Sequence, residues 1–351
     1  MSDNDKKTLE EKNEVRKNFF LKVYDRHYKK LMILSFVLLL FSVFSLIFQF
    51  ATTGDFVNKG ITLKGGLTLT FNSATPINSD DVQAYLRKIY PKADINVRSF
   101  NELGSYGFVI EASDLSEQEI VSALKESNYV SDFQYNSEVT GPSLGKAFFT
   151  QTLKAVFIAF LFMSLIVYLY FGSSGKLKWL AGFLSIVSGM MMFYSNSIVI
   201  YVISIIIMLF LMYIYFKDSI PSFAIILCAV SDILFSLSVF NMLGYKLNTA
   251  GVAAFLMLIG YSIDTDILLS VRVLKRKDGT IFERIVDAMK TGMIMSSSAL
   301  IAVLTAYFFT TSSVIKEMMF ILAVGLMGDI IFTWIQNAGI LRIYAEKKGM
   351  K

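Results

Sequence analysis

The chain has 351 residues, of which 54% are hydrophobic and only 17% are Asp, Glu, Lys or Arg. A water-soluble domain of this length carries more charge, so the composition is typical of an integral membrane protein. The net charge of +5 does not indicate a nucleic-acid partner, because the basic residues cluster in short segments beside apolar runs. One cysteine, Cys228, and one histidine, His27, exclude a disulfide framework, a Cys- or His-based metal centre and a His-dependent triad. We therefore expect no metal, no cofactor and no enzymatic activity.

The first predicted element is a membrane anchor. Residues 1–30 are polar and charged and are interpreted as a basic cytoplasmic tail. Residues 31–50, LMILSFVLLLFSVFSLIFQF, are long enough to cross a hydrocarbon core about 30 Å thick. A cleavable signal peptide would have a shorter charged leader and a small-x-small cleavage pattern, so the sequence favours an anchor that is not cleaved.

Residues 51–147 have the composition of an ordinary soluble domain. Alternating apolar runs indicate four strands, and two amphipathic stretches indicate helices, the second of which opens with the capping box Ser116-x-x-Glu119. The order β-α-β-β-α-β predicts a ferredoxin-like α+β domain outside the membrane. Within it, residues 64–66 (Lys-Gly-Gly) indicate either a turn or bulge or a contact with a substrate.

Seven apolar segments follow this domain and predict, with the anchor, eight membrane spans. They are 152–171, 179–195, 198–216, 221–243, 247–271, 292–309 and 318–341. An even number of spans places both termini on one side. The lysines and arginines of short loops then fall mostly on the side of the termini, with only Lys246 and Lys316 in the short outer loops, which predicts cytoplasmic termini and an extracytoplasmic domain at 51–147.

Two short stretches leave alternatives open. Segment 179–195 is short, and the alternative is that it is re-entrant together with its partner. Thr280-x-x-Glu283 is a second capping box that opens either an interfacial amphipathic helix or a solvated basic loop before the span at 292–309.

Several carboxylates lie inside the predicted spans. At a rise of about 1.5 Å per residue, Asp232 and Asp329 lie about 17 Å along their spans, near the middle of the membrane. Asp264 lies somewhat closer to the cytoplasmic side. An ionisable group facing lipid costs about 2.5–3.5 kcal/mol, so such residues turn inward and mark a pathway or a pair. At about 100° per residue, Arg272 shares a face with Asp264 more nearly than with Asp266. We therefore expect Asp264 inward with Arg272 beside it, and Asp266 directed to another helix or a hydroxyl group.

Carboxylates gathered at one depth can exchange protons, and three of them are more than the cohesion of helices requires. The proton-coupling candidates are Asp264, Asp232, Arg272, Asp329 and Asp266. Ser296, Ser297 and Ser298 enter the next span at comparable depth and are the supporting polar candidates. The alternative is a structural role, in which these groups hold helices together by hydrogen bonds.

Six motifs resemble one known family. They are LKGG in the outer domain, GPSLG before the second span, IPS…SD at 220–232, GYSIDTDILLSVRVLKR, a TG…S…A run from Thr291, and GD…TW.QNAGIL at 328–341. This combination resembles the SecF family of protein-export membrane proteins, archaeal type, within the SecD/SecF family of the resistance-nodulation-division superfamily.

The resemblance implies an accessory subunit of the Sec translocase. Its six-span core would pair with a SecD-like subunit, act beside a SecYE-type channel, contact the exported polypeptide and use the proton-motive force. Asp264 matches the SecD residue implicated in proton coupling, where bacterial SecF has Asn. Asp232 matches an Asp of the preceding family helix, and Arg272 matches the Arg that closes the motif. Two features depart from the family pattern: Thr62 stands where relatives often have Asp, and 172–216 is an inserted hairpin.

The domain organisation follows from these assignments. After the tail (1–30), the first span (31–50) and the outer domain (51–147), the remaining units are the second span at 148–171, the hairpin at 172–216, the SecF-like core at 217–345 and the tail at 346–351. Two other functions are open: a proton-driven exporter of lipid or small molecules, and a scaffold that conducts no protons. An exporter would need a large apolar cleft in the outer domain, which about 90 residues are too few to enclose.

Overall fold

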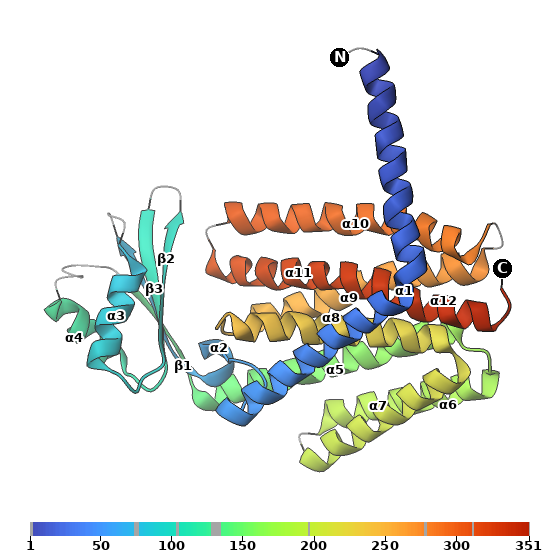
Figure 1. The fold of residues 1–351 in the computed structure, drawn as a ribbon. Helices are drawn as coiled ribbons and strands as arrows, with labels where there is room; N and C mark the ends of the chain where they lie inside the picture. Colours follow the sequence, from blue (N-terminus) through green and yellow to red (C-terminus); the bar gives the residue numbers. More distant parts are fainter. Residues whose placement is uncertain are drawn as a thin grey trace.

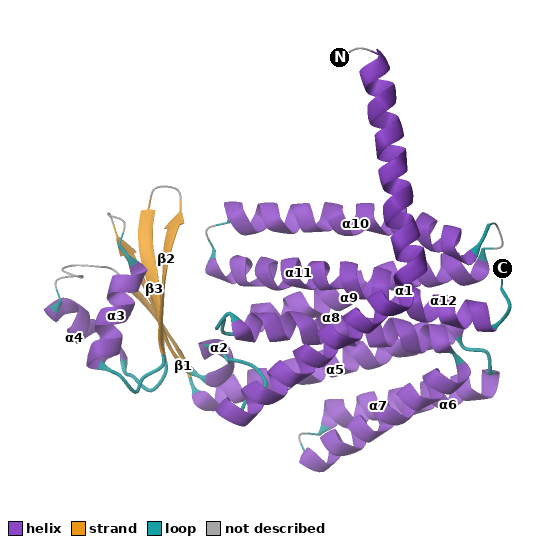
Figure 2. Cartoon of the chain, viewed as in Figure 1, coloured by secondary structure: helices purple, strands orange, loops and turns teal. Residues whose placement is uncertain are grey.

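The structure is a computed structural model that describes residues 3–350 except 74–76, 103–104, 128–134, 196, 277–278 and 311. A bundle of long helices carries a small α+β domain at one end (Figures 1 and 2). Eight helical segments of the described chain are long and apolar enough to cross a membrane. The predicted polytopic class with eight spans is therefore confirmed.

The small domain contains a four-stranded sheet with strand order β2-β3-β1-β4 and antiparallel pairing throughout. Its elements are β1 (Gly66–Ser73), α3 (Ser79–Ile89), β2 (Ile95–Glu102), β3 (Ser105–Ala112), α4 (Glu117–Glu126) and β4 (Tyr135–Thr140). This is the β-α-β-β-α-β order that the sequence predicts. Leu69 of β1 faces Ile110 of β3, and Leu86 of α3 and Leu124 of α4 complete a fully buried core with them. The predicted capping box at Ser116 is formed.

The bundle runs from one end of the molecule to the other. Its helices are α1 (Asp3–Thr53), α5 (Pro142–Phe171), α6 (Gly175–Tyr194), α7 (Ile198–Asp218), α8 (Ile220–Met242), α9 (Thr249–Lys275), α10 (Ile281–Phe309), α11 (Ser313–Ile331), the π-helix η1 (Phe332–Asn337) and α12 (Ala338–Lys347). Helix α1 crosses the bundle against α8 and η1, and its first part projects beyond the other helices (Figure 1). The predicted tail and anchor are thus one continuous helix.

The second capping box opens a membrane helix and not a separate interfacial helix. Thr280 and Glu283 form the box, and α10 continues from there without a break to Phe309. Ile281, Ile285 and Ala288 are buried against α9 and α12. The predicted amphipathic helix is thus formed, with its apolar stripe on neighbouring helices and Glu283 and Lys290 exposed, but it is continuous with the span; the alternative of a solvated loop is wrong.

The hairpin α6–α7 consists of two full-length helices at the side of the bundle (Figure 1). The re-entrant alternative for 179–195 is therefore wrong. Tyr215 of α7 packs on Tyr168 of α5 with ring centroids 4.4 Å apart, and the Tyr168 hydroxyl donates to Asp218 at 2.8 Å. These contacts fix the hairpin to α5 at the end remote from the outer domain.

Two glycine motifs join the outer domain to the bundle. A short helix, α2 (Ile61–Lys64), ends at Gly65, whose φ of 91° is unfavourable for residues with a Cβ atom. A Cβ atom at Gly65 would lie 2.6 Å from Pro142 Cα, and one at Gly145 would lie 2.6 Å from the Gly65 nitrogen. The LKGG and GPSLG motifs are thus in backbone contact, which favours the turn interpretation of the first motif.

Candidate functional site in the membrane core

Helices α8, α9 and α11 approach one another closely because glycines face their neighbours. A Cβ atom at Gly325 of α11 would lie 2.4 Å from the Leu258 methyl groups of α9, and one at Gly328 would lie 2.8 Å from the Phe235 ring of α8. Small residues allow such close packing where lipid offers no hydrophobic driving force. The polar side chains of the three helices therefore meet in a dry interior.

Three aspartates meet there, one from each helix. Asp232 of α8, Asp266 of α9 and Asp329 of α11 are each 0% exposed to solvent. They meet between the two ends of the bundle, and the depth predicted for Asp232 and Asp329 in the membrane stays a prediction. We call these three side chains the carboxylate cluster.

Asp329 lies at the centre of the hydrogen-bond network. Its Oδ1 accepts from the Thr265 hydroxyl at 3.1 Å and from the Thr333 hydroxyl at 2.8 Å, and its Oδ2 accepts from the Ser296 hydroxyl at 3.4 Å. Thr265 belongs to α9, Ser296 to α10 and Thr333 to η1. One carboxylate thus connects four helical elements.

Asp232 is joined to the same network through α9. The Ser262 hydroxyl donates to Asp232 Oδ2 at 2.5 Å. Ser262 lies one turn before Thr265, so one face of α9 supplies hydroxyl donors to the carboxylates of both α8 and α11.

Asp266 is held by the π-helix. Asn337 Nδ2 donates to Asp266 Oδ1 at 2.7 Å, and Gln336 Nε2 donates to Ser231 Oγ at 3.1 Å. A π-helical turn is wider than an α-helical one and is frequent at functional sites. The Tyr24 hydroxyl of α1 donates to the carbonyl oxygen of Trp334 in this segment, so a neighbouring helix supports the altered backbone.

The expected inward orientation of Asp264 is wrong, whereas Asp266 is directed to another helix as predicted. Asp264 is exposed on the outer face of α9, whereas Asp266 is the one that points inward. The reason is the packing of α9, which places Leu258, Ser262 and Asp266 toward α8 and α11. Asp264 lies about 200° around the helix from Asp266 and cannot share that face.

The expected pairing of Arg272 is also wrong. Arg272 Nη1 contacts Asp287 of α10, with 2.9 Å to Oδ2 and 3.0 Å to the carbonyl oxygen. This pair lies at the end of α9 remote from the outer domain. Of the three predicted serines, Ser296 alone bonds the cluster; Ser297 is half-buried, and the exposed Ser298 donates to the Ile294 carbonyl of its own helix.

The cluster has no counter-cation among the described residues. None of the ion pairs found there includes Asp232, Asp266 or Asp329. The described residues likewise contain no group of three or more His, Cys, Asp or Glu side chains arranged to hold a metal ion. Toward the outer domain, an apolar layer that includes Phe255, Ile321 and Leu326 covers the cluster.

Comparisons with known proteins agree with this architecture. The family described as "Protein export membrane protein SecD/SecF, C-terminal" matches residues 184–347, which contain the whole cluster. The protein-export membrane protein SecF of Methanothermobacter thermautotrophicus is 32% identical over 295 residues, covering 83% of this chain and 85% of that protein. The protein-export membrane protein SecF of Pyrococcus furiosus is 29% identical over 321 residues, covering 91% of this chain and 92% of that protein. The chain belongs to the SecF family.

As a SecF family member, the chain is a multi-pass membrane protein and an accessory subunit of the Sec protein-export system. A crystal structure of SecDF from Thermus thermophilus shares its fold, with a TM-score of 0.57 at 15% identity over 93% of this chain. The chain spans 41% of the length of that SecDF chain.

Within this SecF-type core, five polar residues of the site escaped prediction from sequence. They are Ser262, Thr265, Thr333, Gln336 and Asn337. A signal for them exists, because Gln and Asn inside an apolar span are costly unless they find hydrogen-bond partners. Ser262 and Thr265 also share one face of α9 with Asp266, which would have marked the inward side.

Proposed function

We propose that this SecF-type subunit couples proton movement through the carboxylate cluster to late steps of protein export. In this proposal it works with a SecD-like subunit, beside a SecYE-type channel, on a polypeptide that emerges on the side of the outer domain. The termini lie on the cytoplasmic side and residues 51–147 lie outside the cell membrane.

The observation that carries the proposal is the burial of three carboxylates that form no ion pair with any residue that the structure describes. Several unpaired charges in an apolar interior are strongly unfavourable, and a bound proton removes that cost. An ionised Asp329 only accepts hydrogen bonds, whereas a protonated one also donates. Proton binding at Asp329 therefore changes which of Thr265, Ser296 and Thr333 can bond to it, and with them the packing of α9, α10 and η1.

The membrane field can supply the energy for such a cycle. Moving one elementary charge across the membrane is worth about 2.3 kcal/mol per 100 mV. That is comparable with the free energy of one or two buried hydrogen bonds to a charged group. Repacking at the cluster is thus within the reach of the proton-motive force.

The exposed face of α9 supports a SecD-like partner. Met257, Tyr261 and Asp264 form an exposed stripe along this helix. A carboxylate facing lipid inside a span is costly, so a partner subunit with polar groups at this depth stabilises Asp264. A second, related helix bundle packed on this face would cover the exposed stripe and supply polar partners for Asp264.

The proposal is tested by Asp329→Asn. The amide keeps the size of the side chain but cannot bind and release a proton, so export stimulation by a proton gradient should be abolished while the protein stays folded and paired with its partner. The measurement is translocation of a secreted protein into membrane vesicles that contain the SecD–SecF complex, with and without an uncoupler.

Asp287→Asn is the matched control, because Asp287 is half-exposed and pairs with Arg272 and Arg276 away from the cluster. Undiminished proton-dependent export by the Asp329→Asn complex would overturn proton coupling at the cluster. That result would favour the alternative in which this subunit is a scaffold that conducts no protons.

A further inference from the structure

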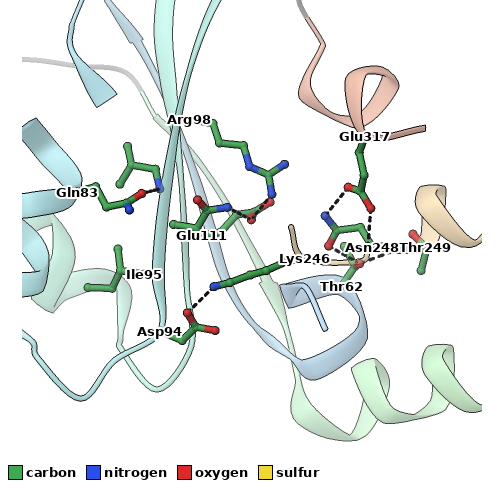
Figure 3. Close-up of polar contacts among 12 residues, drawn as sticks. Thr62, Gln83, Asp94, Ile95, Arg98, Glu111, Lys246, Asn248, Thr249 and Glu317 are labelled. Atoms are coloured by element: carbon green, nitrogen blue, oxygen red, sulfur yellow. Dashed lines mark hydrogen bonds and ion pairs between the residues drawn. The ribbon is translucent and has the colours of Figure 1, made fainter. Parts of the chain in front are cut away.

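Helix α11 carries a buried carboxylate near its first turn, in addition to Asp329 near its last turn. Glu317 is 6% exposed and lies 12 residues before Asp329, about 18 Å along the helix. It faces the junction between the bundle and the outer domain (Figure 3). The carboxylate cluster does not include it.

Glu317 binds the start of α9 with both of its carboxylate oxygens. Oε1 accepts from the backbone N–H of Asn248 at 2.8 Å, and Oε2 accepts from Asn248 Nδ2 at 2.9 Å. Gly251 makes this approach possible, because a Cβ atom there would lie 2.5 Å from Glu317 Oε1. An anion is favourable at this position, where the N-terminus of α9 leaves backbone N–H groups without partners in the helix.

The same asparagine holds the connection to the outer domain. The Thr62 hydroxyl of α2 donates to Asn248 Oδ1 at 3.0 Å and accepts from the backbone N–H of Thr249 at 3.3 Å (Figure 3). Two backbone hydrogen bonds, Gly60 N to Leu247 O at 2.8 Å and Leu247 N to Asn58 O at 2.7 Å, hold the adjoining residues. The Thr62 hydroxyl thus links α2, at the base of the outer domain, to the start of α9.

Glu317 also borders a cavity of about 490 Å³ between the outer domain and the bundle. The other titratable or charged side chains that line this cavity are Arg87, Arg98, Tyr245, Lys246, Tyr307 and Lys316. Two of the cations are paired within the junction, Lys246 with Asp94 and Arg98 with Glu111. The cavity brings Glu317 within reach of protons from the side of the outer domain.

We propose that Glu317 is a proton-responsive positioning residue, which locks the outer domain to α9 and α11 while it is ionised and releases it when it is protonated. Both groups of Asn248 that face Glu317 are donors. Protonation removes the negative charge that strengthens both bonds and places an O–H donor on one of the two oxygens, opposite a group that is itself a donor, so the pair of bonds is weakened. The lock is therefore present when the outer side is neutral or alkaline and weakens as that side becomes acidic.

This inference rests on the proposed function, because α9 and α11 also carry Asp266 and Asp329. A lock at one end of these two helices and a proton site in their middle would couple the outer domain to the cycle of the cluster. An apolar layer lies between Glu317 and the carboxylate cluster, so protons do not pass directly from one to the other. The two sites are connected through the movement of α9 and α11.

The test measures the position of the outer domain without measuring export. Spin labels at Lys88→Cys on α3 and Ile198→Cys on α7 report the distance between the outer domain and the bundle in the full chain, with its SecD-like partner, in lipid nanodiscs. Both positions are exposed, and the native Cys228 is buried and remains unlabelled. The distance distribution is recorded at about pH 8, where an ordinary glutamate is ionised, and at about pH 3.5, below the ordinary glutamate pKa of about 4.3.

We expect a narrow distribution at the higher pH that broadens at the lower pH. Glu317→Gln should be broad at both, with loss of the pH response, because the amide imitates the protonated group. Thr62→Val should broaden the distribution but keep a pH response, since Glu317 is still present. Glu138→Gln, the same change at an exposed carboxylate of β4, should behave like the unmodified chain.

A distribution that does not change with pH in the unmodified chain, or a Glu317→Gln variant that keeps the pH response, would overturn the lock. Failure of the lock is distinguishable from failure of the proposed function. The first appears in the distance distribution, and the second appears in export by the Asp329→Asn complex.

Discussion

The core helices and the hairpin α6–α7 have similar apolar sequences but very different surroundings. In the most apolar 18-residue stretch, 56% of the residues of α8 and of α9 are buried, against 28% in α6 and 22% in α7. Helices α8 and α9 contact neighbours on most sides, whereas the hairpin has a large lipid-facing surface that includes Trp179, Phe183 and Ile206. Apolar composition therefore predicts that a segment spans the membrane, and buried carboxylates distinguish the core helices from the hairpin.

The polar residues of the hairpin follow the same contrast. Its inward face presents small residues, Ser185, Ser188 and Ser204, which are buried. Its carboxylate, Asp218, is at the last residue of α7, where it accepts from Ser173 and Tyr168 at the membrane edge. The hairpin thus keeps its charge at the boundary, while the core brings three charges into the interior.

The largest expected effect comes from tightening the core. A Cβ atom at Gly292 of α10 would lie 2.2 Å from the Trp334 ring of η1. Gly292→Ala should destabilise the protein by about 1–3 kcal/mol, as overpacking of an interior does, and should reduce proton-dependent export because η1 carries Thr333 and Asn337. Thermal unfolding and vesicle export measure the two effects.

Gly182→Ala in α6 is the control for this prediction, since a Cβ atom there would meet nothing within 4 Å. It should be neutral or slightly stabilising, as expected for alanine in a helix. Equal stability of the two variants would show that the close contact at Trp334 does not constrain the core.

A smaller effect is expected where the hairpin joins α5. Tyr168→Phe removes the hydroxyl that donates to Asp218 and keeps the ring contact with Tyr215. The loss should be about 0.5–1.5 kcal/mol in thermal stability, with export unchanged. Tyr170→Phe, at an exposed ring of the same helix, should leave both quantities unchanged. An export defect in Tyr168→Phe at full stability would contradict the division between hairpin and core.

The smallest effect on export is expected from removing the hairpin altogether. The end of α5 and the start of α8 lie at the same end of the bundle, so a deletion of residues 175–217 closed by a short Gly-Ser linker keeps the direction of every other span. Lipid can replace the hairpin along the apolar sides of α5 and α8. Proton-dependent export should persist, measured in vesicles against the full chain. A deletion that inserts and pairs normally but no longer stimulates export would assign the hairpin a role in the cycle.

The sequence predicted the site in part. The depth of Asp232 and Asp329 follows from the position of each residue in its span, because a helix advances by a fixed rise. The helical angle correctly separates Asp264 from Asp266, but it does not say which of them faces the bundle. The choice required knowledge of the neighbours of α9, since its apolar residues surround the helix on all sides.

The sequence by itself determined the membrane class, the eight spans and the order of elements in the outer domain. Each of these depends on local hydrophobicity and periodicity, which a chain expresses before its segments meet. Tertiary structure alone decided that Asp266 is inward and Asp264 outward, that Arg272 pairs with Asp287, and that Thr62 and Glu317 meet through Asn248. These outcomes depend on which helices pack together and on how closely glycine allows them to approach, and both are properties of pairs of distant segments.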